Sequence, residues 1–341
     1  MKAIALISGG LDSTLAAKLM QNLGVELICL NTLTPFCLCN RRSAKGCFHG
    51  ASVVAKELGL KLISINVSEE FIKIVKQPKH GYGSHMNPCI DCRILLFRKA
   101  KEMMQEEGAS FIITGEVLGQ RPMSQKSNTM RLIEKEAGLD GLVLRPLSAK
   151  KLEITIPEKE GWINREKLLA INGRGRNEQF NLAAGFGIKD YPCPSGGCLL
   201  TDPAFSKRVK DLIKYDEFNL NNVRLLRFGR HFRIMQDAKL VVGRDEKEDI
   251  ELERLAQPGD HLFYPNEQLA GPTSLGRGHL NEELIELSAQ ITCRYCDLNG
   301  ATSAGIMYIQ KGTVLPFGDG DSPRLLEVSP LPEAELASLR I

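Results

Sequence analysis

No apolar run in this sequence approaches the roughly 18 residues that a bilayer-spanning helix needs. The N-terminal apolar segment leads straight into a glycine loop, without the cleavage-site pattern of a signal peptide. The net charge of +3 is too small to indicate a nucleic-acid partner by itself, although local basic patches still matter. We therefore expect a cytoplasmic protein with no membrane contact, whose 341 residues leave room for two or three domains.

The ten cysteines, in a reducing compartment, argue against a disulfide framework and favour metal or sulfur chemistry. Cys37, Cys39, Cys47 and His49 either form a tetrahedral zinc site, for which the first spacing is tight, or are loop thiols near the active site. Cys293 and Cys296 have no second Cys-x-x-Cys nearby, so a structural role is favoured there. The remaining thiols are Cys29, Cys89, Cys92, Cys193 and Cys198.

A glycine loop, Ser8-Gly9-Gly10-Leu11-Asp12-Ser13, follows the apolar run 3–7 and precedes a helical stretch to residue 22. A strand, loop and helix in this order leave free backbone N–H groups at the helix N-terminus, which is an anion site. The glycines permit a sharp turn and a close approach to the ligand, and Asp12 adds a carboxylate that can orient Mg²⁺. No Gly-Lys-Ser/Thr follows, so the loop is not of the Walker type.

The six residues 8–13 resemble the pyrophosphate loop (PP-loop) of the ATP-pyrophosphatase superfamily, whose members cleave ATP to AMP and pyrophosphate. This resemblance implies that ATP and Mg²⁺ bind at Ser8, Gly9, Gly10, Asp12 and Ser13, with Asp12 taking part in catalysis.

Apolar runs near residues 25–30, 61–67 and 110–114 alternate with helical stretches, which predicts an α/β fold with a doubly wound parallel sheet. The resemblance makes that fold adenine nucleotide alpha hydrolase-like. Ligands of such sheets bind beyond the carboxyl ends of the strands, where residues 8–13 and Asn31 both fall. Asn31 is therefore added to the nucleotide site.

A second motif, Cys89-Ile-Asp-Cys92-Arg93, opens a helix that runs to about residue 107. A thiol in the first helical turn beside an arginine is expected to have a lowered pKa and to be reactive. The alternative is that the pair is only a packed helix start. Further along, Asn172-Gly-Arg-Gly-Arg176 is a basic loop that either contacts phosphate or is a solvated surface loop.

Residues 114–120 (Thr-Gly-Glu-Val-Leu-Gly-Gln), with Ser124-Gln125 and Leu144-Arg-Pro-Leu147, resemble stretches of the tRNA 4-thiouridine synthetases. The turn at 195–198 is similar to one in the tRNA 2-thiouridylases that carries a catalytic cysteine. The resemblance implies ATP-dependent tRNA thiolation, in which a uridine carbonyl oxygen is adenylated and replaced by sulfur, with Gly115 and Gln120 closing the nucleotide pocket. Those synthetases carry an RNA-binding module before the PP-loop, whereas here the loop begins at residue 8, so the target nucleotide does not carry over.

Two sulfur routes fit these thiols. In one, Cys198 carries a persulfide that a partner thiol resolves. In the other, which we favour, Cys89, Cys92 and either Cys198 or Cys193 bind three irons of a [4Fe-4S] cluster. No rhodanese-like domain follows, and the sulfur donor is expected to be a cysteine desulfurase or sulfide.

The stretch 205–236 carries eight Lys and Arg against three Asp and Glu, interleaved with aromatic residues, which suits an RNA backbone. The alternative is that the aromatics are core and the charges a solvated face. Residues 239–263 resemble the RNA-binding domain of the NFACT proteins, in which a strand ending in Gly-Arg precedes an acidic helix.

We therefore expect a PP-loop domain over 1–175, a cysteine-containing basic connector over 176–220, an RNA-binding domain over 221–280 and a tail over 281–341, the C-terminal part being a smaller α+β domain. The rival hypothesis is a PP-loop enzyme that inserts sulfur or nitrogen into a small molecule rather than tRNA.

Overall fold

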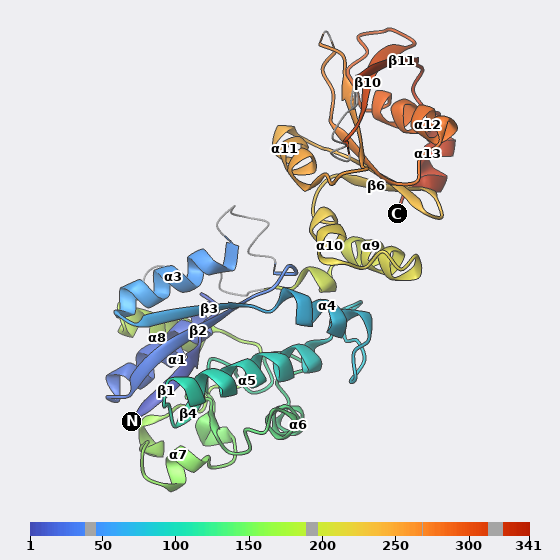
Figure 1. Ribbon diagram of the computed structural model, residues 1–341. Helices are drawn as coiled ribbons and strands as arrows, with labels where there is room; N and C mark the ends of the chain where they lie inside the picture. Colours follow the sequence, from blue (N-terminus) through green and yellow to red (C-terminus); the bar gives the residue numbers. More distant parts are fainter. Residues whose placement is uncertain (38–45, 189–196, 268, 313–322) are drawn as a thin grey trace. The chain divides into compact units, whose positions relative to one another are not determined.

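The computed structural model describes residues 1–37, 46–188, 197–267, 269–312 and 323–341, and the side chains of 46–49 are not described. The chain divides into two compact units, Met1–Asp202 and Pro203–Ile341 (Figure 1). The expectation of a zinc site at Cys37, Cys39, Cys47 and His49, and that of Cys193 as a third thiol, therefore fall wholly or partly outside the described residues.

The first unit is built on a parallel sheet with the strand order β3-β2-β1-β4-β5. Its strands are β1 (Lys2–Leu6), β2 (Glu26–Leu33), β3 (Lys61–Asn66), β4 (Phe111–Thr114) and β5 (Val143–Leu144). This order is that of a doubly wound α/β sheet, which confirms the predicted fold class.

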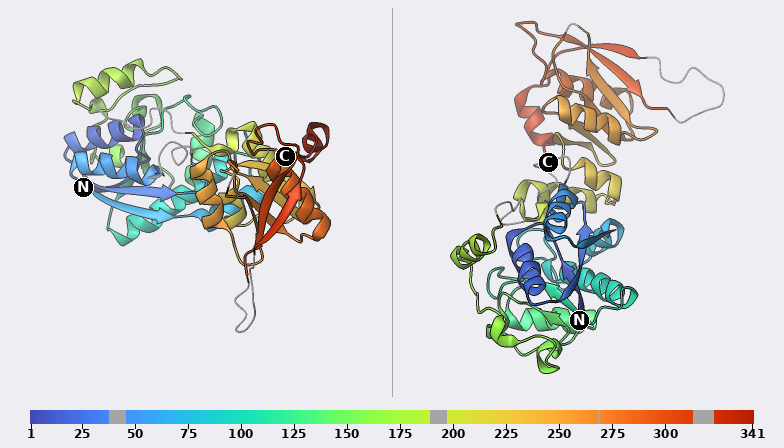
Figure 2. Two further views of the ribbon diagram at one scale, coloured as in Figure 1. Left: turned by 90° about the horizontal axis from the view of Figure 1, so that it is seen from above. Right: turned by 90° about the vertical axis from the view of Figure 1, so that its left-hand side faces the viewer.

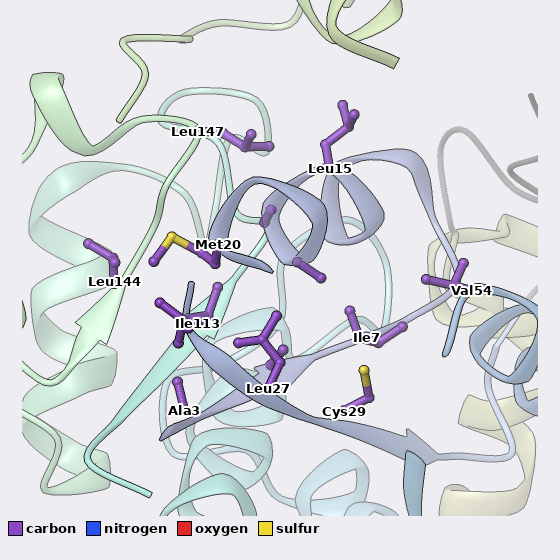
Figure 3. Packing of buried hydrophobic residues seen from close by; sticks show 14 of the residues in the cluster. Ala3, Ile7, Leu15, Met20, Leu27, Cys29, Val54, Ile113, Leu144 and Leu147 are labelled. Carbon is purple, nitrogen blue, oxygen red and sulfur yellow. The ribbon is translucent and has the colours of Figure 1, made fainter. Parts of the chain in front are cut away.

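Helices cover both faces of this sheet because successive strand residues point to opposite sides. Ala3, Leu27 and Ile113 face a cluster that includes Leu15 and Met20 (Figure 3). Their neighbours along the strands, such as Ile4 and Ile112, face a second cluster on the opposite side. The helices of this unit are α1 (Leu11–Asn22), α3 (Gly46–Leu58), α4 (Ser68–Lys76), α5 (Cys89–Glu106), α6 (Ser127–Ala137), α7 (Ile156–Lys159) and α8 (Asn177–Gly185). The sequence analysis predicted the helical stretches that form α1 and α5.

β1 and β4 are neighbours in the sheet although the chain leaves them towards opposite edges. At such a switch point the loops that follow the two strands separate and leave a crevice beyond the carboxyl ends. The PP-loop follows β1, and the loop beginning at Thr114 follows β4. The fold therefore brings together the two motifs that the sequence marks as nucleotide-binding.

The second unit contains an antiparallel sheet with the strand order β11-β10-β8-β9-β7-β6. α12 lies against β8, β10 and β11 (Figures 1 and 2). The strands are β6 (Arg230–Met235), β7 (Ala238–Val242), β8 (His261–Pro265), β9 (Ser274–Gly278), β10 (Ala304–Gln310) and β11 (Arg324–Val328). The helices are α9 (Pro203–Lys214), α10 (Leu220–Leu225), α11 (Glu246–Leu255), α12 (Glu282–Cys293) and α13 (Glu333–Leu339).

The chain divides into two units rather than the four expected segments, and the boundary between the units follows Asp202. Residues 281–341 are not a separate tail, because β10 and β11 hydrogen-bond into the same sheet as β8. The expected strand, Gly-Arg and acidic helix are present as β7, Gly243-Arg244 and α11, whose N-terminus is capped by the Asp245 carboxylate. Among the described residues, no helix is both long and apolar enough to cross a membrane.

Gly115 permits the closest approach between the two nucleotide motifs. A Cβ at this position would lie 2.4 Å from the Ser13 backbone nitrogen and 2.5 Å from the Asp12 carbonyl carbon. Both are backbone atoms at the start of α1, so no rotamer change can relieve the overlap.

We predict that Gly115→Ala destabilises the protein by about 1–3 kcal/mol, because the added methyl group must displace α1 or the loop after β4. Thermal unfolding should show a lower midpoint than wild type. Gly185→Ala is the control, since its Cβ would meet no atom within 4 Å. Equal midpoints for the two variants would contradict the prediction.

Candidate functional site

A cavity of about 260 Å³ lies at the carboxyl ends of β1, β2 and β4. It is lined by all but one of the described residues predicted from the sequence, namely Ser8, Gly10, Asp12, Ser13, Asn31, Cys89, Cys92, Gly115, Gln120 and Cys198. The exception is Gly9, which lies against the backbone of Gly50. Its φ of +74° and a Cβ position only 2.5 Å from the Gly50 carbonyl carbon require glycine.

The PP-loop is closed on itself by side-chain hydrogen bonds. The Ser13 hydroxyl donates to the Gly10 carbonyl oxygen (2.9 Å), and the Ser8 backbone N–H donates to Ser13 Oγ (3.4 Å). The Thr14 N–H donates to the Gly10 carbonyl oxygen (3.1 Å), whereas the N–H groups before it belong to the first turn, which has no preceding acceptor. These groups are placed to bind an anion.

The Asp12 carboxylate is only 16% exposed. Burial raises its pKa, and nearby Gln120, Arg176 and Arg121 partly offset that rise. Oδ2 lies 4.0 Å from Arg176 Nη2, and Oδ1 has no hydrogen-bond partner among the described residues. A carboxylate oxygen left without a donor beside an anion site is the kind of ligand that Mg²⁺ takes, so the residues present fit this ion.

Three arginines join the predicted site residues in the cavity wall, Arg93, Arg121 and Arg176. Arg176 comes from the basic loop 172–176, which docks on the loop after β4 through a hydrogen bond from the Gly173 N–H to the Leu118 carbonyl oxygen (2.7 Å). Of the two readings of that loop, the structure therefore favours a contact with the site. Arg121 was not predicted as a site residue, although its position directly after Gln120 was a sequence signal for it.

Three free thiols reach this cavity from two distant parts of the chain. Cys89 and Cys92 lie in the first turn of α5. Cys198 is brought in by its neighbours: the Leu199 N–H donates to the Phe36 carbonyl oxygen (2.7 Å) and the Met86 N–H to the Leu200 carbonyl oxygen (3.1 Å). Cys37 also lines the cavity but is disulfide-bonded.

The expectation of a lowered thiol pKa at the start of α5 is wrong. Burial raises the pKa of Cys89, raises that of Cys92 to about 11 and raises that of Cys198 to about 12. The positive charges of Arg121 and Arg93 lower the pKa of Cys89, but the loss of water around the thiol has the larger effect.

The thiols interact with one another, since Cys92 and Cys89 both raise the pKa of Cys198. Across the described residues, no three His, Cys, Asp or Glu side chains gather closely enough to hold a single metal ion. The ligands of a [4Fe-4S] cluster bind separate irons and therefore lie farther apart than ligands of one ion. Three convergent thiols, which are soft donors, fit such a cluster.

Glu116 links the nucleotide motif to the helix that carries the thiols. Its carboxylate is 2% exposed and accepts a hydrogen bond from Arg145 Nε at 3.0 Å. The other carboxylate oxygen lies 3.3 Å from Arg93 Nε, one residue after Cys92. Arg145 also pairs with Glu134, so the two motifs that resemble the 4-thiouridine synthetases are joined by buried charges.

Two family models match the chain. Residues 1–159 match the one described as thiamine biosynthesis protein (ThiI), and residues 229–338 match the NFACT protein RNA binding domain. Both resemblances inferred from the sequence are thereby confirmed, and the second extends well beyond residues 239–263.

Curated relatives carry matching names. A tRNA-specific 2-thiouridylase of Pelobacter propionicus is 30% identical over 34% of this chain and 33% of its own length. A probable tRNA sulfurtransferase of Methanosarcina mazei is 32% identical over 35% of this chain and 29% of its own length. The chain thus spans about a third of the length of these relatives.

Solved structures with some likeness include a 4-thiouridine synthetase in complex with RNA and bound ATP, at 21% identity and a TM-score of 0.37. That match covers 66% of this chain and 52% of the other. The U34-tRNA thiolase NcsA from Methanococcus maripaludis with its [4Fe-4S] cluster has 17% identity and a TM-score of 0.34, covering 67% of this chain and 70% of its own.

The raised thiol pKa values predict slow alkylation of the reduced, iron-free protein. With a pKa of about 11, Cys92 has roughly 300-fold less thiolate at pH 7.5 than a cysteine of ordinary pKa near 8.5. Iodoacetamide labelling followed by mass spectrometry should show Cys92 reacting far more slowly in the folded protein than in urea, with a rate that still climbs above pH 9. Equal rates in the folded and denatured protein would contradict this.

Proposed function

We propose that the protein is an ATP-dependent sulfurtransferase that thiolates a uridine of tRNA. The observation that carries the proposal is that the PP-loop and three free thiols line one cavity. The names of the relatives support the same reaction class and the same substrate.

In the first half-reaction, the uridine carbonyl oxygen attacks the α-phosphorus of ATP, and the bond to pyrophosphate breaks. In the second, sulfur adds to the carbon that bears the adenylated oxygen, and AMP leaves with that oxygen. The N–H groups at the start of α1, together with Arg121 and Arg176, are placed to stabilise the negative charge that builds on the phosphates. Asp12 would hold the Mg²⁺ that accompanies ATP.

Cys89, Cys92 and Cys198 are proposed as the ligands of a [4Fe-4S] cluster, which would supply sulfide at the iron that has no protein ligand. The persulfide route requires a free thiolate, and the raised pKa of Cys198 counts against it. The protein itself brings these three thiols together beside the nucleotide site and places the positive charges of Arg93 and Arg121 near them. A cysteine desulfurase or free sulfide is the proposed sulfur donor.

Anaerobic purification with iron and sulfide analysis tests the cluster. We expect about four irons and four sulfides per chain in wild type, and loss of both in Cys89→Ala and Cys198→Ala. Cys293→Ala is the matched control, because that thiol is buried in the second unit against the Val328 carbonyl oxygen. Iron-free protein under strict anaerobic handling would overturn the cluster assignment.

The same preparations test the reaction when they are supplied with ATP, sulfide and unmodified tRNA. A mercury-containing gel should retard thiolated tRNA made by wild type and Cys293→Ala but not by the two cluster variants. ATP cleavage to AMP that depends on a small molecule and not on tRNA would instead support the rival hypothesis.

Arg176→Gln should lower the rate of pyrophosphate release by about 100-fold, because it removes one cation from the phosphate site. Arg176 also lowers the pKa of Asp12, so its loss should raise that pKa and move the acidic limb of the pH–rate profile to higher pH. Arg174→Gln, an exposed arginine on the same loop, is the control. Identical pH profiles for both variants would contradict a role of Arg176 at Asp12.

A further inference from the structure

Helix α9 (Pro203–Lys214) has two different faces. Phe205, Val209 and Leu212 are buried. Lys207, Lys210 and Lys214 are exposed. Their spacing of three and four residues puts the lysines on one stripe, opposite the buried side chains.

Several other basic residues of the stretch 205–236 are used within the fold. Arg208 is buried and donates to the Leu226 carbonyl oxygen (2.6 Å). Arg230 donates to the Gly243 carbonyl oxygen (2.6 Å) and stacks on the Tyr295 ring at 4.5 Å. Phe218 and Phe232 are core residues. The expectation that this whole stretch faces RNA is therefore wrong for these residues.

Two acidic residues next to the lysines, Asp211 and Glu217, pair with Arg233, and Glu217 also pairs with Lys239. Arg233 Nη2 donates to Asp211 Oδ2 at 2.5 Å, and Arg233 Nη1 donates to Glu217 Oε1 at 2.8 Å. Asp211 belongs to α9 itself, so this contact removes its negative charge from the helix surface and ties α9 to β6. Asp216, which follows α9, is exposed.

The lysine stripe differs from several exposed arginines of this unit. Other exposed arginines carry acidic partners: Arg244 pairs with Glu248, Arg254 with Glu251 and Arg324 with Glu282. By contrast, neither Lys207 nor Lys214 has an acidic partner among the described residues. Lys207 Nζ donates to the Arg340 carbonyl oxygen (3.5 Å), and Lys214 Nζ lies over the Tyr215 ring at 4.9 Å.

We propose that Lys207, Lys210 and Lys214 bind the phosphate backbone of the RNA substrate. This inference rests on the proposed function and adds where the second unit holds the RNA. The stripe lies before residue 229, where the match to the RNA binding domain starts, and α9 begins five residues after Cys198. Lysine contacts to phosphate position a nucleic acid without reading its sequence.

The test uses the full chain with K207Q, K210Q and K214Q combined. Binding of an unmodified tRNA transcript is measured by fluorescence anisotropy over a series of KCl concentrations. Loss of three phosphate contacts should reduce the slope of log K against log[KCl] by about 2–3. In thiolation assays the KM for tRNA should rise, while kcat at saturating tRNA and the affinity for ATP stay at wild-type values.

The matched control combines K56Q, K73Q and K135Q, which remove the same charge from exposed positions of the first unit. The control should keep the wild-type salt slope. The single variant K210Q, with a slope reduced by about 0.8, serves if the triple variant unfolds early. Wild-type tRNA binding with an unchanged slope in both stripe variants overturns this inference alone, whereas a wild type that binds no tRNA overturns the proposed function with it.

Discussion

The carboxylate of Glu116 holds together the parts of the first unit on which the site depends. This carboxylate pairs with Arg145 after β5 and with Arg93 on α5. The preceding residue, Gly115, has no side chain, so the loop after β4 can lie directly against the start of α1. Removing one partner of a buried pair leaves an uncompensated charge, at a cost of about 3–5 kcal/mol. The distance between the loop after β4 and the thiol-bearing helix α5 is thus fixed by charged groups whose separation would cost free energy.

Burial dominates the electrostatics of the thiols. A helix N-terminus contributes about 1 kcal/mol to an anion at its first turn. Raising the pKa of Cys92 to about 11 corresponds to on the order of 3 kcal/mol in the opposite direction. A site built in this way keeps its thiols protonated until something replaces the lost water, which a metal does by binding the thiolate directly. The same burial that makes them poor free nucleophiles suits them to be ligands.

The parts of the fold and site that the sequence predicted are those encoded by local patterns. The PP-loop, β1 to β4 and the Cys89–Cys92 helix start all follow from alternation, glycines and spacing within short windows. The positions of Cys198 and Arg176 depend on backbone hydrogen bonds between segments far apart in the chain. The sequence therefore marked both residues as candidates but did not predict that they lie in the cavity. The roles of Arg208 and Arg233 were predicted wrongly because a basic residue looks the same in the sequence whether its partner is a phosphate or a carbonyl or carboxylate oxygen of its own fold.

The small net charge of the chain is compatible with an RNA-binding surface because acidic side chains are paired within the fold while several lysines are exposed on α9. Arg233 and Lys239 together offset the charges of Asp211 and Glu217, and the Arg277 guanidinium offsets that of Asp260. Acidic side chains paired in this way weaken the field of exposed lysines less than unpaired ones would. Since exposed charges separated by more than about 8–10 Å are screened at physiological salt, a phosphate backbone responds to the local stripe on α9 and not to the overall sum of +3.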